Sequence, residues 1–115
     1  TQAGSPLYAR QAYWSVVGTW EATRNPYAPG EGLNVLPYHV LVPAFGDWGF
    51  VLATVEDPAS LELDLPKGLA FLNGPVWAAA RFFGRDVERM AARVNSVRDH
   101  ALVAYYVDGW EKWFR

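Results

Sequence analysis

The side chains best placed to bind a ligand lie in a short segment, Pro43 to Phe50, that joins two apolar runs of the chain. Between its ends it contains the aromatic residues Phe45 and Trp48, the acid Asp47 and two glycines. Loops at the ends of sheet strands commonly line ligand sites, because the strands hold them in place. The segment is therefore a candidate for part of a binding site, although a tight hairpin of packed aromatic residues is the simpler interpretation.

Other residues with possible chemistry form weaker patterns. The run 30–32, Gly-Glu-Gly, has no third glycine and no preceding strand, so it predicts a plain loop rather than a phosphate site. His39 and His100 are far apart and have no carboxylate at ligand spacing, which predicts no metal site. Glu62 and Asp64 would share one face of a strand, where paired carboxylates can act as acid and base. A solvated edge is the simpler interpretation of that pair.

A group of aromatic residues near the end of the chain has two interpretations. Tyr105, Tyr106, Trp110 and Trp113 recur at roughly helical spacing, and their rings would suit the stacking of a ligand. Aromatic residues at this spacing more often form a core or an interface. The sequence contains no serine in the sharp turn that nucleophilic hydrolases use.

Composition limits the class of protein. The chain has 115 residues, of which 51% are apolar and 16% aromatic, and this predicts one folded domain. A net charge of −2 leaves no basic face for nucleic acid, and the absence of cysteine excludes disulfides and thiolate metal sites. No segment has the length and apolarity of a membrane span or a signal peptide, so we expect a cytoplasmic chain. The abrupt start beside a helix signal suggests a piece of a longer protein, and processing explains it equally well.

The periodicity of apolar residues predicts a mixed α/β order of elements. Residues 25–34, rich in proline and glycine, predict a loop, and the apolar runs around Pro43–Phe50 predict an antiparallel hairpin. The alternating residues 61–65 predict an edge strand or an extended coil. Ser5 and Asp99 are expected to cap the first and last helices. The expected helices are 6–22, 76–83, 85–92 and 100–114, and the expected strands are 36–42 and 49–55.

A hairpin that is apolar on both faces is not a stable sheet by itself. Its edges need partner strands from a preceding segment, from another copy of the chain or from an unusual local arrangement. The pattern therefore predicts that the chain associates, and a homo-oligomer paired through strand edges is one form of that association. A non-catalytic oligomerisation module, which uses exposed strand edges and aromatic residues, is the alternative function.

Four segments, in order, resemble the spermidine synthase (polyamine aminopropyltransferase) family. Residues 38–53, from Tyr-His-Val-Leu-Val-Pro to Phe-Val-Leu-Ala, resemble its penultimate and last strands, most closely those of the bacterial branch that often has a membrane-embedded N-terminal part. Residues 1–6 resemble the Gln-x-x-Ser-Pro segment after the family's fifth strand. Residues 81–87 and 94–113 resemble stretches near the end of those enzymes.

The resemblance implies that residues 1–115 are a single partial domain, the C-terminal segment of a methyltransferase-like Rossmann sheet. The chain would supply a crossover helix, the antiparallel last strand pair and the C-terminal helices. The family transfers an aminopropyl group from decarboxylated S-adenosylmethionine, its co-substrate, to putrescine or a related amine. Its glycine-rich nucleotide loop and catalytic Asp match nothing in this chain, which implies that this piece has no catalytic residue and binds no cofactor alone.

The resemblance also implies a small set of substrate-binding residues. Gln2 aligns with a Gln near the amine, and Phe45 aligns with a Tyr that contacts the amine in many members, although Phe45 lacks the hydroxyl. Gly4 stands where many soluble members have Glu. Asp47 and Trp48 are added because they lie in the same loop as Phe45. The parent would be cytoplasmic, with an anchor in the membrane through its N-terminal part in this branch.

Overall fold

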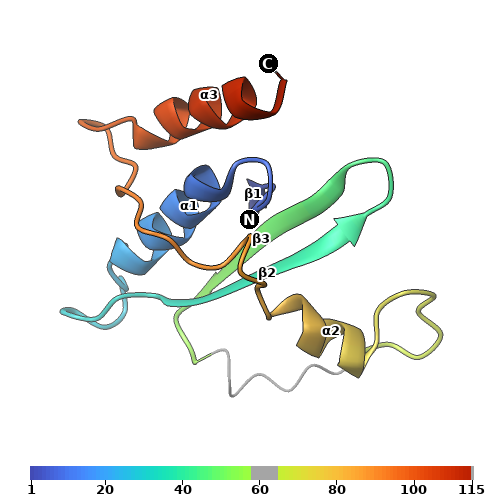
Figure 1. The fold of residues 1–115 in the computed structure, drawn as a ribbon. Coiled ribbons are helices and arrows are strands. Elements are labelled where there is room, and N and C mark those ends of the chain that lie inside the picture. Colours follow the sequence, from blue (N-terminus) through green and yellow to red (C-terminus); the bar gives the residue numbers. More distant parts are fainter. Residues whose placement is uncertain (58–64, 115) are drawn as a thin grey trace.

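The computed structural model describes residues 1–57 and 65–114, which combine helices with an antiparallel sheet (Figure 1). The predicted mixed α/β class is thus confirmed. The prediction for Glu62 and Asp64 lies outside the described residues. In chain order the elements are β1 (Gln2–Gly4), α1 (Arg10–Ala22), β2 (Asn34–Val42), β3 (Gly46–Thr54), α2 (Gly74–Ala80) and α3 (Ala101–Phe114).

The predicted hairpin is present, with longer strands than expected. β2 and β3 pair antiparallel from Asn34 opposite Thr54 to Val42 opposite Gly46. The turn closes with a hydrogen bond of 3.0 Å from the Phe45 N–H to the Val42 carbonyl. Gly46 has a φ of 82°, a left-handed conformation that glycine adopts at little cost. Glycine at this position therefore lets β3 begin directly after the turn, earlier than the predicted residue 49.

A third strand at the start of the chain pairs with the hairpin, in the order β1-β3-β2. The Thr1 ammonium donates to the Val51 carbonyl at 2.6 Å, and the Val51 N–H donates to the Thr1 carbonyl at 2.8 Å. Since β1 and β2 both run antiparallel to β3, they run parallel to each other, and α1 crosses between them. β3 therefore receives its second partner from within the chain, a strand that the sequence pattern does not reveal.

α1 covers one face of the sheet with its most buried side chains. Tyr13 and Val17 have no exposed surface, and they pack with Trp14, Ala3 and Val51 in the core. The Tyr13 hydroxyl lies 3.0 Å from the Phe50 carbonyl and 3.3 Å from the Tyr38 carbonyl, so it is shared between two strands. Burial, reinforced by the negative charge of Asp47, raises the pKa of Tyr13, which keeps this hydrogen-bond donor protonated.

The helix predicted at 85–92 is wrong, because this segment lies along α1 as turns and extended chain. Its carbonyls accept hydrogen bonds from α1 side chains instead of from its own backbone. The indole N–H of Trp14 donates to the Val87 carbonyl at 3.0 Å, and Arg10 Nε donates to the Glu88 carbonyl at 2.8 Å. A helix would need these carbonyls for itself, so the contact with α1 replaces it.

The first and second helices are also shorter than predicted. α1 begins at Arg10 rather than at Pro6, because the Ser5 hydroxyl accepts the N–H groups of Leu7 and Tyr8, each at 3.2 Å, and holds a separate turn. α2 ends at Ala80 rather than at residue 83. In both cases the residues expected to extend the helix make other bonds. The segment before α1 forms the turn held by Ser5, and the Phe82 carbonyl after α2 lies within hydrogen-bond distance of His39.

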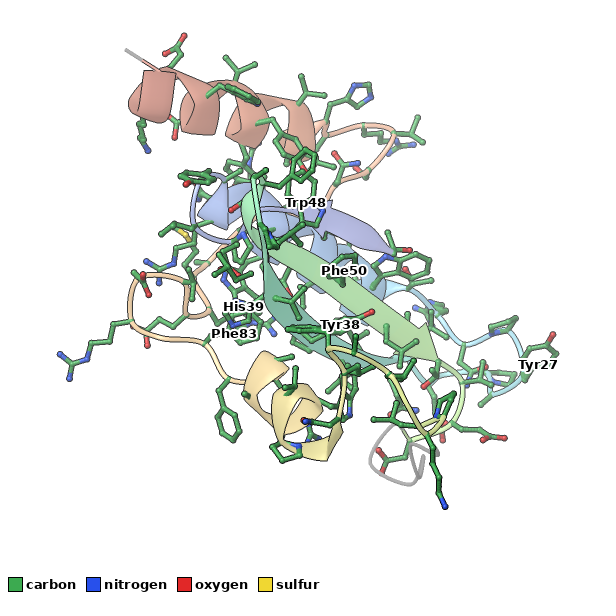
Figure 2. All side chains as sticks on the ribbon, turned by 90° about the vertical axis from the view of Figure 1, so that its right-hand side faces the viewer. Tyr27, Tyr38, His39, Trp48, Phe50 and Phe83 are labelled. Atoms are coloured by element: carbon green, nitrogen blue, oxygen red, sulfur yellow. The ribbon has the colours of Figure 1, made fainter. Side chains whose placement is uncertain are left out.

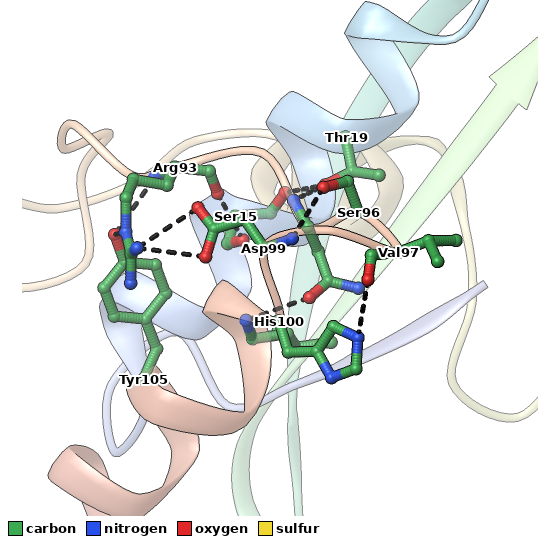
Figure 3. A network of polar contacts seen from close by, with 10 residues as sticks. Ser15, Thr19, Arg93, Ser96, Val97, Asp99, His100 and Tyr105 are labelled. Carbon is green, nitrogen blue, oxygen red and sulfur yellow. Dashed lines mark hydrogen bonds and ion pairs between the residues drawn. The ribbon is translucent and has the colours of Figure 1, made fainter.

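A polar network joins the loop before α3 to α1 (Figure 3). The Thr19 hydroxyl accepts the Asn95 N–H at 2.9 Å, and the Asn95 side chain accepts the Leu102 N–H at 3.1 Å. Asn95 therefore satisfies the start of α3, a role predicted for Asp99. The Asp99 carboxylate instead pairs with Arg93 at 3.0 Å. These bonds fix the position of α3 on α1, on the side of α1 away from the sheet (Figure 1).

We predict that Gly49→Ala destabilises the fold, while Gly18→Ala does not. A Cβ at Gly49 would lie 2.3 Å from a ring carbon of Tyr13 and 2.8 Å from the Gly4 carbonyl. Overpacking of this kind costs about 1–3 kcal/mol or more. Gly18 is the matched control, because a Cβ there meets nothing within 4 Å and alanine favours the helix. Urea unfolding measures both variants, and a Gly49→Ala chain as stable as the wild type would contradict the packing of α1 on β3.

Candidate functional site

A cavity of about 560 Å³ opens at the end of the sheet, and we call it the aromatic pocket. Because β1 and β2 run parallel, their carboxyl ends meet at this edge, and the loops after both strands line the cavity. Such edges are where α/β sheets bind ligands. Its wall combines small residues with five aromatic side chains: Tyr8, Phe45, Trp48, Tyr106 and Trp110.

The hairpin supplies two of these rings. Phe45 and Trp48 meet edge to face, with ring centroids 6.2 Å apart and planes at 75°. Phe45 is 67% exposed, while Trp48 is half-buried. The indole N–H of Trp48 is buried and has no hydrogen-bond acceptor among the residues that the structure describes. The two rings therefore present an apolar and π-rich surface to the cavity, beside one unsatisfied donor.

The last helix closes the opposite side of the aromatic pocket. The Tyr106 hydroxyl donates to the Ala3 carbonyl at 3.3 Å, and burial raises the pKa of Tyr106, so this donor stays protonated. Gly4 has a φ of 78°, and a Cβ there would lie 2.6 Å from the Tyr106 hydroxyl oxygen. Glycine at position 4 is thus required both by the backbone conformation and by the approach of α3.

Asp47 faces a different part of the molecule. Neighbouring side chains of a strand point to opposite faces, so Asp47 cannot share the side of β3 that Trp48 occupies. Its carboxylate oxygens lie 2.8 and 2.9 Å from His39 Nδ1. His39 Nε2 lies 2.5 Å from the Phe82 carbonyl, and its ring stacks on Phe83 at 4.3 Å (Figure 2). Both ring nitrogens of His39 therefore lie within hydrogen-bond distance of an oxygen.

The His39–Asp47 pair lines a second cavity, of about 810 Å³, between β2 and the α2 region. Apart from His39 and Asp47 the described lining is apolar, and it includes the exposed residues Leu41, Phe71 and Phe82. The side chains of His39 and Asp47 are only 17% and 18% exposed, so the pair is a partly buried link between the hairpin and the segment after α2. These contacts indicate a structural role, in which the pair holds β2, β3 and the segment after α2 together.

The structure thus divides the four residues predicted to bind substrate. Phe45 and Trp48 lie together in the aromatic pocket, and Asp47 lies in the second cavity. Gln2 belongs to β1, where its backbone pairs with Phe50; Gly4 of the same strand lines the aromatic pocket, and Gln2 is not among the lining residues. That these residues contact a substrate stays a prediction.

Three further rings line the pocket: Tyr8, which no pattern in the sequence singles out, and Tyr106 and Trp110, for which ligand stacking was the less favoured interpretation. Tyr106 and Trp110 are four residues apart on a helix, and this spacing places them on one helix face, which is a signal that the sequence does contain. Nothing in the sequence indicates that this face meets the hairpin. None of the described residues that line the aromatic pocket is acidic or basic.

Metal and membrane features are limited within residues 1–57 and 65–114. No group of three or more His, Asp or Glu side chains there has an arrangement that could hold a metal ion. None of the helices in the described ranges combines the length and the apolarity needed to cross a bilayer.

We predict that the His39–Asp47 pair stabilises the fold through a coupling of about 1–2 kcal/mol, within the range measured for residues in direct contact. A double-mutant cycle with His39→Gln and Asp47→Asn, followed by urea unfolding, measures this coupling. The exposed pair Asp108–Lys112, at 2.6 Å on α3, is the matched control, and its coupling should not exceed about 0.5 kcal/mol. Equal coupling in the two pairs would contradict a structural role for Asp47.

Comparison with curated proteins finds relatives across nearly the whole chain. A protein of Leptospira interrogans named polyamine aminopropyltransferase is 38% identical over 111 residues, which are 96% of this chain and 20% of the relative. Polyamine aminopropyltransferase 1 of Streptomyces coelicolor is 37% identical over 112 residues, or 95% of this chain and 19% of the relative. A polyamine aminopropyltransferase of Oceanobacillus iheyensis is 32% identical over 116 residues, or 97% of this chain.

The chain spans about one-fifth of the length of these relatives. No family model matches it, and no solved structure matches it. The relatives agree in name, and each match covers at least 95% of the chain, a share that must include the hairpin. The chain is therefore homologous, over nearly all of its length, to part of the polyamine aminopropyltransferases.

Proposed function

We propose that the chain is the C-terminal part of an aminopropyltransferase and that it supplies one side of the acceptor-amine site. The observation that carries this proposal is the 38% identity to a polyamine aminopropyltransferase over 96% of the chain. The position of the aromatic pocket supports it, because the cavity lies where α/β sheets bind ligands. The donor is decarboxylated S-adenosylmethionine, and the acceptor is putrescine or a related amine.

The reaction is a nucleophilic substitution at carbon. The lone pair of the neutral amine attacks the aminopropyl carbon attached to the sulfonium, the new C–N bond forms, and the C–S bond breaks. The bonding electrons return to sulfur, which leaves as a neutral thioether, and the alkylated amine loses a proton to a base. We propose that the base and the nucleotide loop belong to the preceding part of the parent protein. The contribution of this chain is to bind and orient the amine.

The rings of the aromatic pocket suit that role. An alkylammonium group interacts favourably with the face of a Trp or Phe ring, by about 0.5–2 kcal/mol. Its methylene chain gains from contact with the same apolar walls. We propose that Phe45 and Trp48 bind the amine, with Gln2 on the neighbouring strand. We assign Asp47 to positioning, since it lies on β3 beside Trp48 and bonds this strand to His39 of β2.

The alternative role, oligomerisation through strand edges, meets an obstacle at β2. Val51 directs its N–H and carbonyl toward Thr1, so its partner Pro37 directs its own backbone away from β3, toward the free edge of the sheet. Proline has no N–H, and prolines in edge strands discourage pairing with another strand. The observation favours the enzyme role for the hairpin over assembly through this edge.

We predict that the isolated chain transfers no aminopropyl group. Incubation with decarboxylated S-adenosylmethionine and putrescine, followed by chromatographic analysis of amines, should detect no spermidine above the enzyme-free control. The reason is that no residue of the chain matches the family's nucleotide loop or catalytic Asp. Spermidine formed in proportion to the amount of chain would contradict this division of the enzyme.

A chimera tests the positive side of the proposal. We predict that this chain, when it replaces the matching segment of the Leptospira relative, supports spermidine formation. Trp48→Ala in the chimera should raise the KM for putrescine about tenfold, which corresponds to about 1.4 kcal/mol, and leave the KM for the nucleotide donor unchanged.

Two control variants accompany this experiment. Trp48→Phe keeps a ring face and should lose less affinity for putrescine. Tyr27→Ala removes an 84% exposed ring that does not line the aromatic pocket, and it should change nothing. A chimera that is folded by circular dichroism and binds the donor but forms no spermidine would refute the proposed function.

A further inference from the structure

The last helix, α3, forms one side of the aromatic pocket, opposite the residues that the hairpin supplies. Tyr106, Gly109 and Trp110 of α3 all line the cavity. Gly109 sets the distance of this wall, because a Cβ there would lie 3.0 Å from the Tyr8 carbonyl and 3.3 Å from Ala9 Cα. α3 therefore rests directly on the backbone of the loop that follows β1.

The wall is anchored at one end and open at the other. Tyr106 is half-buried and donates to the Ala3 carbonyl, so its ring is fixed beside the loop after β1. Trp110 lies one helical turn farther along α3 and is 60% exposed. A ligand that contacts Tyr106 must extend by about one helical turn along α3 to contact the ring of Trp110 as well.

The lining also determines which forces can bind a ligand. None of the described lining residues has a charged side chain, so no carboxylate in the described wall can fix the position of an ammonium group. Binding must then depend on contact between methylene groups and ring faces and on cation–π attraction. Contact with methylene groups grows with the length of the chain, whereas pairing with a carboxylate depends on the spacing of the charges.

We propose that α3 is the chain-length gauge of the acceptor site and that Trp110 favours longer alkylamines over shorter ones. The inference rests on the proposed function, since it takes the occupant of the aromatic pocket to be the acceptor amine. Each methylene that becomes buried against the wall should tighten binding roughly three- to fourfold. Tyr106 positions the wall, and Trp110 supplies the additional ring face at its open end.

Calorimetric titration of the full chain with a homologous series of diamines tests this proposal. The probes are 1,3-diaminopropane, putrescine, cadaverine and 1,6-diaminohexane, with the matching diols as uncharged controls. Affinity should rise steadily along the diamine series, and the diols should bind at least tenfold more weakly. In proton–nitrogen NMR spectra, the indole signals of Trp48 and Trp110 should both shift with 1,6-diaminohexane, and only that of Trp48 with 1,3-diaminopropane.

Variants of α3 separate the gauge from general stability. Trp110→Ala should flatten the increase along the diamine series to less than twofold per methylene. Trp110→Phe, which keeps a ring, should preserve most of it. Val107→Ala on the same helix is the matched control, because Val107 is exposed and does not line the cavity, and it should leave the series unchanged.

Three results would overturn the proposal: no saturable binding of any diamine, an affinity independent of chain length, or an equal loss in Trp110→Ala and Val107→Ala. These failures are distinct from failure of the proposed function. A chimera that forms spermidine while Trp110→Ala leaves its amine selectivity unchanged refutes only the gauge. A chain that binds diamines with the expected length dependence, within a folded chimera that forms no product, refutes only the proposed transfer.

Discussion

The position of the aromatic pocket depends on the contact between Tyr13 of α1 and the bare backbone of Gly49 in β3. With no Cβ at position 49, the Tyr13 ring lies on the central strand and its hydroxyl reaches the carbonyls of Tyr38 and Phe50. This contact fixes the distance between α1 and the sheet. The loop after β1 connects this strand to α1, so the same contact limits where the loop can lie. α3 packs against the backbone of that loop at Tyr8 and Ala9.

The sequence predicts the elements that local patterns determine, and it misses those that distant contacts determine. The hairpin is predicted because two apolar runs flank a glycine-containing turn. β1 has only three residues, Gln2 to Gly4, and these have no strand pattern. It forms because Thr1 hydrogen-bonds to Val51, fifty positions along the chain. Residues 85–92 have a helical pattern, but two of their carbonyls accept hydrogen bonds from side chains of α1 instead of from a helical backbone.

The candidate site follows the same division. Phe45 and Trp48 are predictable because a loop between buried strands is a common place for a ligand site. The separation of Asp47 from Trp48 was not predicted, because the second strand was expected to begin at residue 49. β3 begins at Gly46, and adjacent residues of a strand face opposite sides. The rings of Tyr106 and Trp110 are predictable as one helix face. That this face meets the hairpin depends on the Asn95 and Arg93 network and on Gly109, which only the folded chain brings together.

The two polar features of the hairpin show why the chain suits one half of a larger site. His39 and Asp47 bond to each other, and neither lines the aromatic pocket, so the pair links the two strands without adding a polar group to that wall. The Trp48 indole N–H is buried without an acceptor in the described parts of the chain, a state that costs about 1–3 kcal/mol. Charge recognition and the removal of a proton both need groups that these walls lack. A surface that offers ring faces and no charged group can orient a ligand but cannot remove a proton from it. Under the proposed function, the chemistry of the transfer therefore belongs to residues outside this chain.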